Sequence, residues 1–583
     1  MEANEQPKPI YEILFKTSFK SIVNQSRQRD LIILLGVSLI SRIATAAVVT
    51  QPGYPDPAYY FDVAKNLASG HGFTEDFIFT YLTPANNVVH PSNLYWMPLT
   101  SIVIAPFFAL FGTSWHIAQI PIILLSVSLP LLAYWIGWDI FQSRRYALAI
   151  GLFTLIGGSI YPYYLVSTNT ISLYGLVSLL ALIGMYQGWR GHPWRFALAG
   201  IAIGLAHLTR TDGVLLLLVG GIVWLCSQKK RSRTDKSSET TRLHPIPWQA
   251  LLGMCSFYLL TMAPWFIRNI ELVGSPLPTW TTTTIWFTNY SDFFSFHKTI
   301  SPQAYLAWGL GNILRSKVQV LTDIFLFLNT ILYIPIPFVI LGMWIERKRA
   351  ELLPFLIYLV LLYGILSLVF SFPSIHGTFF QSLIGLLPPL YGWAIAGIDA
   401  TIIYINKLFG AKKENERRAM YLTITILMAI AVVLSEKTIL DTAATWNQNY
   451  PIYQKIGGIV ANDYRENRKL HNSVQPLVMV SNAADYYYVT SQHAVLLPAQ
   501  DLSTILDVAQ SYSVSYILFN PDLGIEPPQF WQTTLSDSRL KLIWASSSEK
   551  LYRFLPVWQQ QELTVKSLKS EESGKGLLRR KSI

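Results

Sequence analysis

The sequence predicts an all-α polytopic membrane protein of about eleven transmembrane helices, with a large first external loop and a small C-terminal α/β domain. Charged residues make up 14% of the 583-residue chain, against about 25% in globular proteins, and hydrophobic residues make up 51%. Long apolar runs with almost no charge recur, as bilayer-spanning helices of roughly 20 residues require. The last 146 residues change character and alternate short β-rich runs with helical segments. This composition excludes an ordinary soluble enzyme, a disordered chain and a fibrous protein.

The long apolar runs define the predicted membrane spans. Two short ones, 195–208 and 213–226, meet at the polar sequence Thr209-Arg210-Thr211-Asp212-Gly213. Such a break at membrane depth is tolerated only where it lines an enclosed or watery cavity. The eleven predicted spans are 31–49, 116–138, 146–163, 168–188, 195–208, 213–226, 248–268, 320–344, 353–370, 377–398 and 419–437.

Lysine and arginine predict the orientation of these spans. With the N-terminus in the cytoplasm, the inner loops hold 22 Lys and Arg, whereas the outer side without the C-terminal domain holds five. This asymmetry predicts a multi-pass protein of the plasma (inner) membrane, with its C-terminal domain external or periplasmic. It also accounts for the formal net charge of +11, so we expect no nucleic-acid partner. The inner loops are 16–30, 139–145, 189–195, 227–247, 346–352 and 406–418.

The apolar stretch 97–112 does not fit this orientation as a span, so we interpret it as an interfacial or re-entrant helix on the outer side. Residues 50–115 then form one external loop. The β-rich runs 477–480, 494–497, 515–519 and 540–544, with a helical segment at 501–512, indicate a small α/β domain. The predicted organisation is a cytoplasmic N-terminus (1–30), a membrane domain (31–437), an external α/β domain (438–556) and a basic, unstructured tail (557–583).

Cys226 and Cys255 both lie in apolar runs, so no disulfide framework or thiolate metal site is expected. The sequence also has no phosphate-binding P-loop, no dinucleotide-binding glycine pattern and no zinc spacing. We therefore expect no metal site and no cofactor, while a need for a divalent metal stays open.

The external loop 50–115 is acidic and rich in aromatic residues, and Asp56 opens a predicted helix within it. An Asp followed by a proline is typical of a helix N-cap, and the local pattern favours that interpretation. A functional carboxylate is compatible with it, because a capping side chain is held rigid where the chain leaves the membrane.

Charged and histidine residues near the outer ends of the spans form a second group of candidates. Arg210 and Asp212 at the polar break either recognise a phosphate or brace two half-spans. Arg268 is either a phosphate ligand or an interface anchor. His376 either donates to a phosphate or caps the next helix, and His90 belongs to an aromatic belt or lines a cavity.

Three features occur in a fixed order along the chain. Asp56 follows the first span, the Thr-Arg-x-Asp-Gly break follows at 209–213, and a Pro-Trp-x-x-Arg-Asn exit stands at 264–269. With the odd span count and the C-terminal α/β domain, this order resembles the C-type (GT-C) integral-membrane glycosyltransferases. The resemblance is to their bacterial branch, which is similar to protein O-mannosyltransferases and aminoarabinose transferase.

The resemblance implies an enzyme that transfers a sugar from a polyprenyl-phosphate-linked donor to an acceptor on the outer face of the membrane. In that family the first external loop holds the catalytic acid, which Asp56 matches by position. Two departures are Pro57, where family members often carry a second acid, and His90-Pro91-Ser92, which lacks a Lys. Candidate contacts to the lipid phosphate or the sugar are Arg210, Asp212, Arg268, His376, Tyr59, Tyr60, Glu75, Asp76 and His90.

The chemistry of such a site predicts a mechanism. A carboxylate within reach of an acceptor hydroxyl acts as general base, and attack on the anomeric carbon expels the lipid phosphate with inversion. Arg210 is the first choice to stabilise that phosphate, ahead of Arg268 and His376.

Two other classes of membrane protein are alternatives to a glycosyltransferase. A secondary transporter would show repeat symmetry, which this sequence lacks. A non-catalytic membrane scaffold with a sugar-binding external domain is the other alternative, and an assay with lipid-linked sugar separates it from an enzyme. The sugar, the acceptor (glycan, lipid or protein), the oligomeric state and the role of the C-terminal domain stay open.

The orientation is testable by cysteine labelling. A cysteine placed at Ser291 should react with a membrane-impermeant reagent added outside, whereas one at Ser237 should not, because 227–247 is predicted to be cytoplasmic. The reverse pattern would place the proposed site in the wrong compartment.

Overall fold

The computed structural model describes residues 10–82, 85, 87–158, 161–229, 243–278, 280–372, 378–410, 412–467, 475–520, 535 and 537–555. Three sequence predictions concern residues outside these ranges: the role of His376, the labelling site Ser237 and the character of the tail 557–583.

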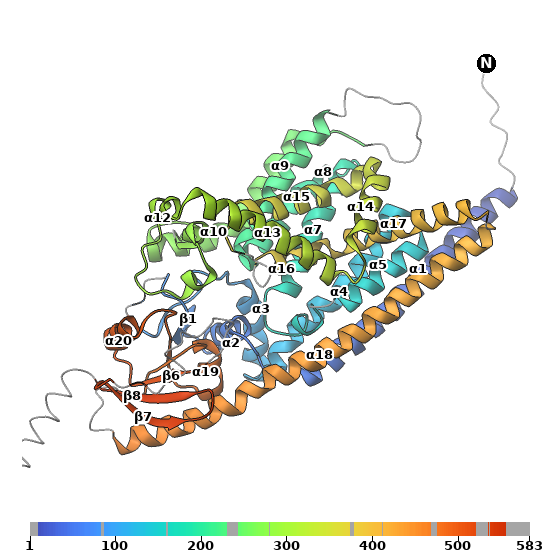
Figure 1. The fold of residues 1–583 in the computed structure, drawn as a ribbon. Helices are drawn as coiled ribbons and strands as arrows, with labels where there is room; N and C mark the ends of the chain where they lie inside the picture. The colour runs from blue at the N-terminus through green and yellow to red at the C-terminus, as the bar shows by residue number, and fades with distance from the viewer. Residues whose placement is uncertain are drawn as a thin grey trace, which may run out of the picture.

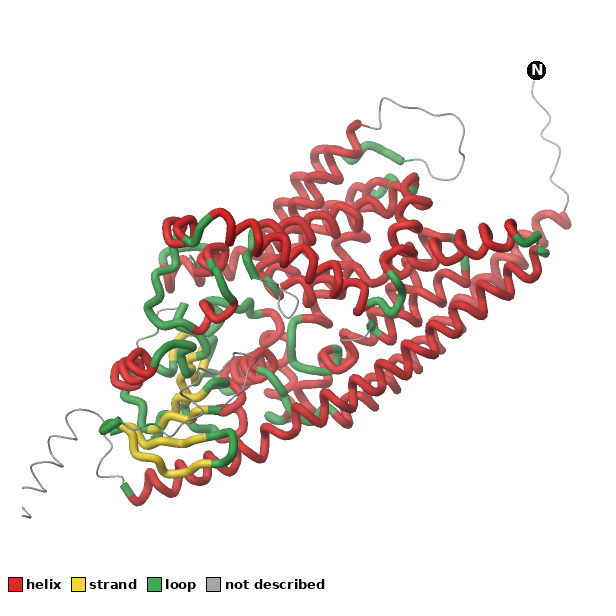
Figure 2. The backbone as a smooth tube through the Cα atoms, in the orientation of Figure 1, coloured by secondary structure: helices red, strands yellow, loops and turns green. Residues whose placement is uncertain are grey.

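The helices of the membrane part form an elongated bundle with the β-sheet at one end (Figures 1 and 2). They are α1 (Ile10–Val48), α4 (Trp115–Phe141), α5 (Arg144–Ile156), α7 (Ile171–Trp189), α8 (Pro193–Thr209), α9 (Leu215–Lys229), α10 (Trp248–Val273), α13 (Leu310–Ile331), α14 (Ile336–Ile345), α15 (Leu353–Leu368), α17 (Leu387–Leu408) and α18 (Lys413–Glu466). The other α-helices are α2 (Pro55–Ala68), α3 (Leu99–Phe111), α6 (Tyr161–Tyr164), α11 (Trp280–Thr283), α12 (Pro302–Ala307), α16 (Thr378–Leu383), α19 (Ala483–Thr490) and α20 (Leu502–Ser511).

Within the described ranges, eight helices are long and apolar enough to cross a membrane, or nine if the bent pair α13 and α14 is one span. The predicted class, a polytopic α-helical membrane protein with a small α/β part, is confirmed. Two other predicted spans correspond to helices that fall short of the length needed to cross a membrane. They are α5 with 13 residues and α8 with 17. Helix α5 ends early because Gly157 and Gly158 both take positive φ angles, which end a right-handed helix.

The span predicted over 320–344 is not one straight helix. Helices α13 and α14 meet at an angle of 90°. Pro335 stands directly before α14, and a proline removes a backbone donor and clashes with the preceding turn. The stretch 97–112 forms α3, whose 13 residues span about 20 Å, too short for a hydrocarbon core of about 30 Å.

The C-terminal part contains the sheet, and each β-rich run seen in the sequence forms a strand. The order is β2-β5-β4-β6-β8-β7. Strands β2, β5, β4 and β6 are parallel to one another, and β8 pairs antiparallel with both β6 and β7. The edge strand β2 (Phe77–Ile78) comes from the loop 50–115, which is predicted to be external and is hereafter named the external loop; the sequence did not indicate this strand. The other strands are β4 (Val478–Val480), β5 (Ala494–Leu496), β6 (Tyr516–Phe519), β7 (Leu540–Ala545) and β8 (Lys550–Phe554), and β1 (Thr74–Glu75) pairs separately with β3 (His90–Pro91).

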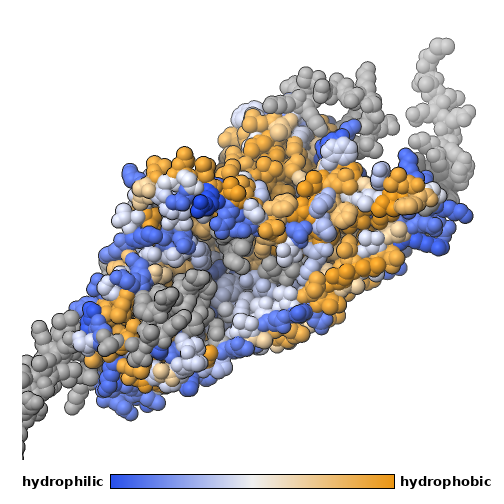
Figure 3. Space-filling view, viewed as in Figure 1, coloured by the Kyte–Doolittle hydropathy of each residue, from blue (hydrophilic) through white to orange (hydrophobic). Residues whose placement is uncertain are grey.

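The external loop and the C-terminal domain share a hydrophobic core. Tyr59 and Val63 of α2 pack in one cluster with Tyr453 of α18 and Tyr516 of β6. Helix α18 is 54 residues long and continues past its apolar part, so that it runs along the bundle to the sheet (Figure 1). Figure 3 shows apolar surface over the helical body, with hydrophilic patches toward the sheet and toward the junction of α17 and α18. This pattern suits a protein whose middle lies in lipid.

Candidate functional site

Asp56 lies in the first turn of α2, close to the bundle. The helix begins at Pro55 and its N-cap residue is Tyr54, whose backbone is extended. The interpretation of Asp56 as the N-cap is therefore wrong: the fixed φ of Pro55 suits the first helical position and moves the start of the helix one residue earlier. At the second position the carboxylate still lies near the positive end of the helix dipole. Its side chain is consequently available to contact other elements.

Arg210 stands at the break between α8 and the 3-10 helix η1 (Thr211–Val214), with an extended backbone. The break depends on Gly213. A Cβ atom there would lie 2.4 Å from the backbone carbon of Ala206, so only glycine allows η1 to fold back on the end of α8. The turn aims the guanidinium toward α7 and α16.

Four side chains from three elements contact the guanidinium of Arg210. Its Nε donates to Asp212 at 3.0 Å and to Ser382 at 3.1 Å, and its Nη1 donates to Thr170 at 3.3 Å and to Gln381. Ser382 also donates to Asp212. No described residue accepts a hydrogen bond from Nη2 of Arg210, so these two N–H donors are available to a ligand.

Gln381 joins Arg210 to Asp56. Its Nε2 donates to Oδ2 of Asp56 at 3.3 Å, while its Oε1 accepts from Arg210 and, at 2.8 Å, from Thr170. The site therefore brings together α2 from the external loop, the start of α7, the α8–η1 break and α16.

Burial raises the pKa of Asp56 from 3.8 to about 6, while the hydrogen bond from Gln381 and the charge of Arg210 act in the opposite direction. Asp56 nevertheless stays partly exposed, so protein surrounds the carboxyl without sealing it from solvent. Burial raises the pKa of several tyrosines, and the nearby charge of Asp56 adds to the rise at Tyr54, Tyr60, Tyr95, Tyr164 and Tyr290. The carboxyl therefore has several tyrosine side chains in its neighbourhood.

Of the predicted residues, the structure brings Asp56, Arg210, Asp212 and Tyr60 together. It groups others in a second cluster around Tyr59: Nε2 of His90 lies 2.6 Å from a carboxylate oxygen of Glu75, and the hydroxyl of Tyr59 accepts from the backbone of Asn93.

The other predicted residues in the described ranges, Arg268 and Asp76, make their hydrogen bonds away from Asp56 and Arg210. Arg268 donates to the backbone oxygen of Ser92 at 2.7 Å. Asp76 accepts from Asn66 and from Tyr487 at the contact between α2 and α19. Each of these side chains already has protein partners apart from Asp56 and Arg210.

Three residues of the site were not among those predicted from the sequence, namely Thr170, Gln381 and Ser382. The available signal was weak: uncharged polar residues at the ends of two apolar runs, 168–188 and 377–398. Such residues are common in membrane helices, and only the fold shows that they face Arg210.

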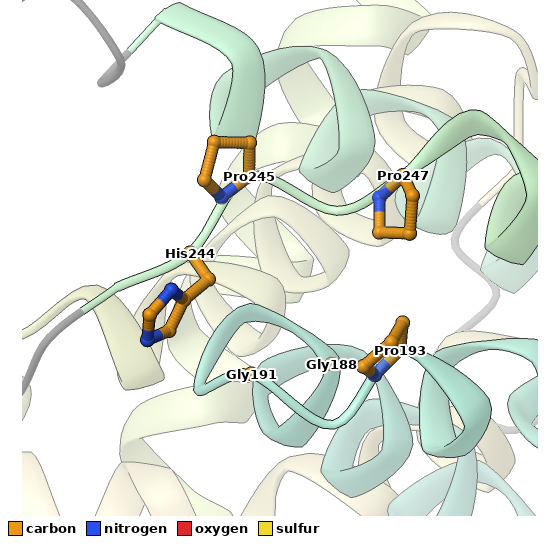
Figure 4. A pocket seen from close by; sticks show the side chains of 6 residues that line it. All are labelled: Gly188, Gly191, Pro193, His244, Pro245 and Pro247. Atoms are coloured by element: carbon orange, nitrogen blue, oxygen red, sulfur yellow. The ribbon is translucent and has the colours of Figure 1, made fainter.

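A separate cavity of about 260 Å³ opens at the turn between α7 and α8 (Figure 4). It lies at the start of α8, whereas Arg210 follows the end of this 17-residue helix, about 25 Å away. It is therefore distinct from the Asp56 site. The lining residues are Gly188, Gly191, Pro193, His244, Pro245 and Pro247.

No protein-family model matches the sequence, and no curated protein sequence matches it. Solved structures match in fold. ArnT from Cupriavidus metallidurans, bound to undecaprenyl phosphate, aligns at a TM-score of 0.52 and 12% identity, over 90% of this chain and 97% of that one. The chain has the fold of the C-type glycosyltransferases. The archaeal oligosaccharyltransferase AglB from Archaeoglobus fulgidus, in complex with an inhibitory peptide and a dolichol-phosphate, aligns at 0.48 and 12% identity, over 84% and 69% of the two chains.

The raised pKa of Asp56 has a consequence for stability. The folded state binds the proton more tightly than the unfolded chain, so this carboxyl lowers stability as pH rises from about 4 to about 6, by at most about 3 kcal/mol. Asparagine cannot ionise. Asp56→Asn should therefore melt at a higher temperature than the wild type at pH 7.5, and the difference should shrink toward pH 5.

Asp501→Asn is the control of opposite sign. Hydrogen bonds from Ser503 and Thr504 lower the pKa of Asp501 at the start of α20, so its ionised form stabilises the fold. This variant should melt no higher than the wild type at pH 7.5. Equal melting of Asp56→Asn and wild type at both pH values would contradict a desolvated carboxyl at position 56.

Proposed function

We propose that this protein transfers a sugar from a polyprenyl-phosphate-linked donor to an acceptor hydroxyl on the outer face of the membrane, with Asp56 as the general base. The observation that carries the proposal is the joined pair Asp56 and Arg210. A carboxylate and a guanidinium from distant parts of the chain face one site, and each keeps hydrogen-bonding capacity that no described residue uses.

The fold supports the choice of donor. The ArnT structure that shares this fold is bound to undecaprenyl phosphate, a polyprenyl phosphate. In the present chain, Arg210 offers the two donors of Nη2 beside an apolar bundle, and charge-assisted N–H···O bonds from a guanidinium to phosphate oxygens are among the strong hydrogen bonds. A lipid-linked phosphate satisfies both the charge of Arg210 and the apolar surroundings.

The two charged groups have complementary roles in the proposed reaction. Asp56 accepts the proton of the acceptor hydroxyl as its oxygen attacks the anomeric carbon. The bond from that carbon to the phosphate oxygen breaks, and attack from the opposite face inverts the anomeric configuration. Arg210 stabilises the negative charge that develops on the departing lipid phosphate, an effect that is larger in a site shielded from water.

The environment of Asp56 suits a base near neutral pH. A general base works best when its pKa lies close to the operating pH, and burial moves the pKa of Asp56 to about 6. An exposed aspartate with a pKa near 3.9 would hold the accepted proton more weakly.

Asp56→Asn tests the role of the base. An amide cannot take a proton from a hydroxyl, and general base catalysis contributes roughly 10²–10⁴ in rate, so transfer should fall by at least about two orders of magnitude. Mass spectrometry of envelope glycans and lipid-linked sugars, compared between cells with the gene, without it and with the variant, measures the effect. The variant should match the deletion, with loss of a glycan and accumulation of its lipid-linked donor.

Asp76→Asn is the matched control, because Asp76 lies in the same external loop and contacts Lys65, Asn66 and Tyr487 instead of the site. Cells with this variant should keep the glycan. If folded Asp56→Asn protein keeps activity within a few-fold of wild type, Asp56 is not the base.

Arg210→Lys tests phosphate recognition against bracing. Lysine keeps the charge but cannot reach Asp212, Gln381 and a phosphate together, so turnover per folded molecule should fall at least about tenfold. Arg144→Lys is the control: Arg144 makes a two-bond fork to Asp30, at 2.7 Å for each bond, at a contact between α1 and α5. It should lose stability and keep turnover.

The bracing interpretation makes a different prediction. If Arg210→Lys and Asp212→Asn both lower the melting temperature and leave turnover per folded molecule intact, the pair only holds η1 against α16.

A further inference from the structure

Gln381 occupies the space between Asp56 and Arg210, and its amide contacts both. It is 6% exposed and makes hydrogen bonds at both ends. The two charged residues, both within the described ranges, form no direct ion pair, and the carboxylate partner of Arg210 is Asp212. A neutral amide therefore stands where a salt bridge could otherwise form.

The orientation of this amide follows from its partners. A guanidinium can only donate hydrogen bonds, so the amide oxygen of Gln381 must face Arg210. The hydroxyl of Thr170 donates to the same oxygen at 2.8 Å. With the oxygen fixed by two donors, the NH₂ group must point the other way, toward Oδ2 of Asp56.

We propose that Gln381 is a positioning residue, whose amide aims the carboxylate of Asp56 and keeps it available as a base instead of a partner of Arg210. This inference rests on the proposed function, in which Asp56 accepts a proton. The amide donates to Oδ2, and the other donor found for this carboxyl within the described ranges is the backbone N–H of Asp56 itself, so the carboxylate keeps acceptor capacity for the acceptor hydroxyl. In the same way Arg210 keeps Nη2 for the phosphate. Gln381 thus lets two opposite charges share one site without neutralising each other.

A hydrogen bond to the ionised form of a carboxyl lowers its pKa, and the bond from Gln381 acts in that direction on Asp56. The other groups facing Asp56 are Arg210, which is always charged, and tyrosines that stay neutral below pH 8.5. Titration of this carboxyl between pH 4.5 and 8.5 therefore reports on Asp56 itself. The tyrosines are Tyr54 and Tyr60 beside and on α2, Tyr95 before α3, Tyr164 of α6 and Tyr290 of the 3-10 helix η4 (Tyr290–Phe294).

The test is the pH dependence of carbodiimide labelling at Asp56 in the full-length protein in lipid vesicles. Dicyclohexylcarbodiimide reacts with protonated carboxyls, and mass spectrometry of the peptide that holds Asp56 measures the labelled fraction. Wild-type labelling should decline with a midpoint near pH 6. Gln381→Met has a similar length and still fills the space between Asp56 and Arg210, but it donates no hydrogen bond, so its midpoint should rise by about half to one pH unit.

Two further variants keep the test decisive. Gln381→Asn retains an amide that is too short to bridge both partners and leaves Arg210 room to approach Asp56, so its midpoint should fall instead. It replaces Gln381→Met if that protein does not fold. Gln119→Met is the matched control: Gln119 is a buried glutamine, 1% exposed, whose Nε2 donates to the backbone oxygen of Val49 at 3.0 Å. Its loss should leave the midpoint at Asp56 unchanged.

An unchanged midpoint in a folded Gln381 variant, or an equal shift in Gln119→Met, would overturn the positioning role. Wild-type Asp56 that takes no label at pH 4.5 would also overturn it, because the carboxyl would then not be open to a ligand. The glycan analysis of Asp56→Asn separates the two proposals. If that variant keeps the glycan while Gln381→Met shifts the titration, the proposed function fails and the contact between Gln381 and Asp56 stands.

Discussion

A guanidinium beside the hydrocarbon of a bilayer is tolerated only where the protein supplies acceptors for it, and Arg210 organises the part of the bundle next to α2 for that reason. Its acceptors come from the start of α7, from η1 and from α16. These elements are far apart in the sequence, and the requirement for hydrogen bonds holds them around one point. Through Gln381 the same network reaches α2 and Asp56. The polar break that interrupts two apolar helices is thus the place where the membrane helices meet the external loop.

The external loop is held from the other side by the C-terminal domain. Strand β2 adds to the edge of the sheet next to β5, and Lys65 of α2 makes an ion pair with Asp76 and a hydrogen bond to Tyr487 of α19. Tyr59 and Phe77 are buried in the same core as Tyr516. The domain therefore does more than follow the membrane part in sequence, since it completes the support of the helix that carries Asp56.

At the end of the bundle away from Asp56, ion pairs join neighbouring helices. Arg144 pairs with Asp30, Arg145 with Asp399, and Arg190 with Asp139 and Glu351. These arginines belong to the loops whose positive charge predicts the membrane orientation. Their pairing joins α1, α4, α5, α7 and α17 where the apolar spans end. The arginines that predict the membrane orientation therefore also join these helices.

The sequence by itself determined the membrane class and the helical composition, because long uncharged apolar runs have no other stable environment. Four strands of the C-terminal sheet followed from local β-rich runs. Asp56 and Arg210 were predicted as candidate site residues from their positions, one directly after the first span and the other in a polar break between two apolar runs. The tertiary structure decided what local patterns cannot encode. Pro55, and not Asp56, begins α2, and two residues of the first loop complete a sheet formed 400 residues later. Gln381 became part of the site only when α16 packed against Arg210. An uncharged polar residue in an apolar run carries no signal of its own, since its role depends on which distant charges the fold brings to it.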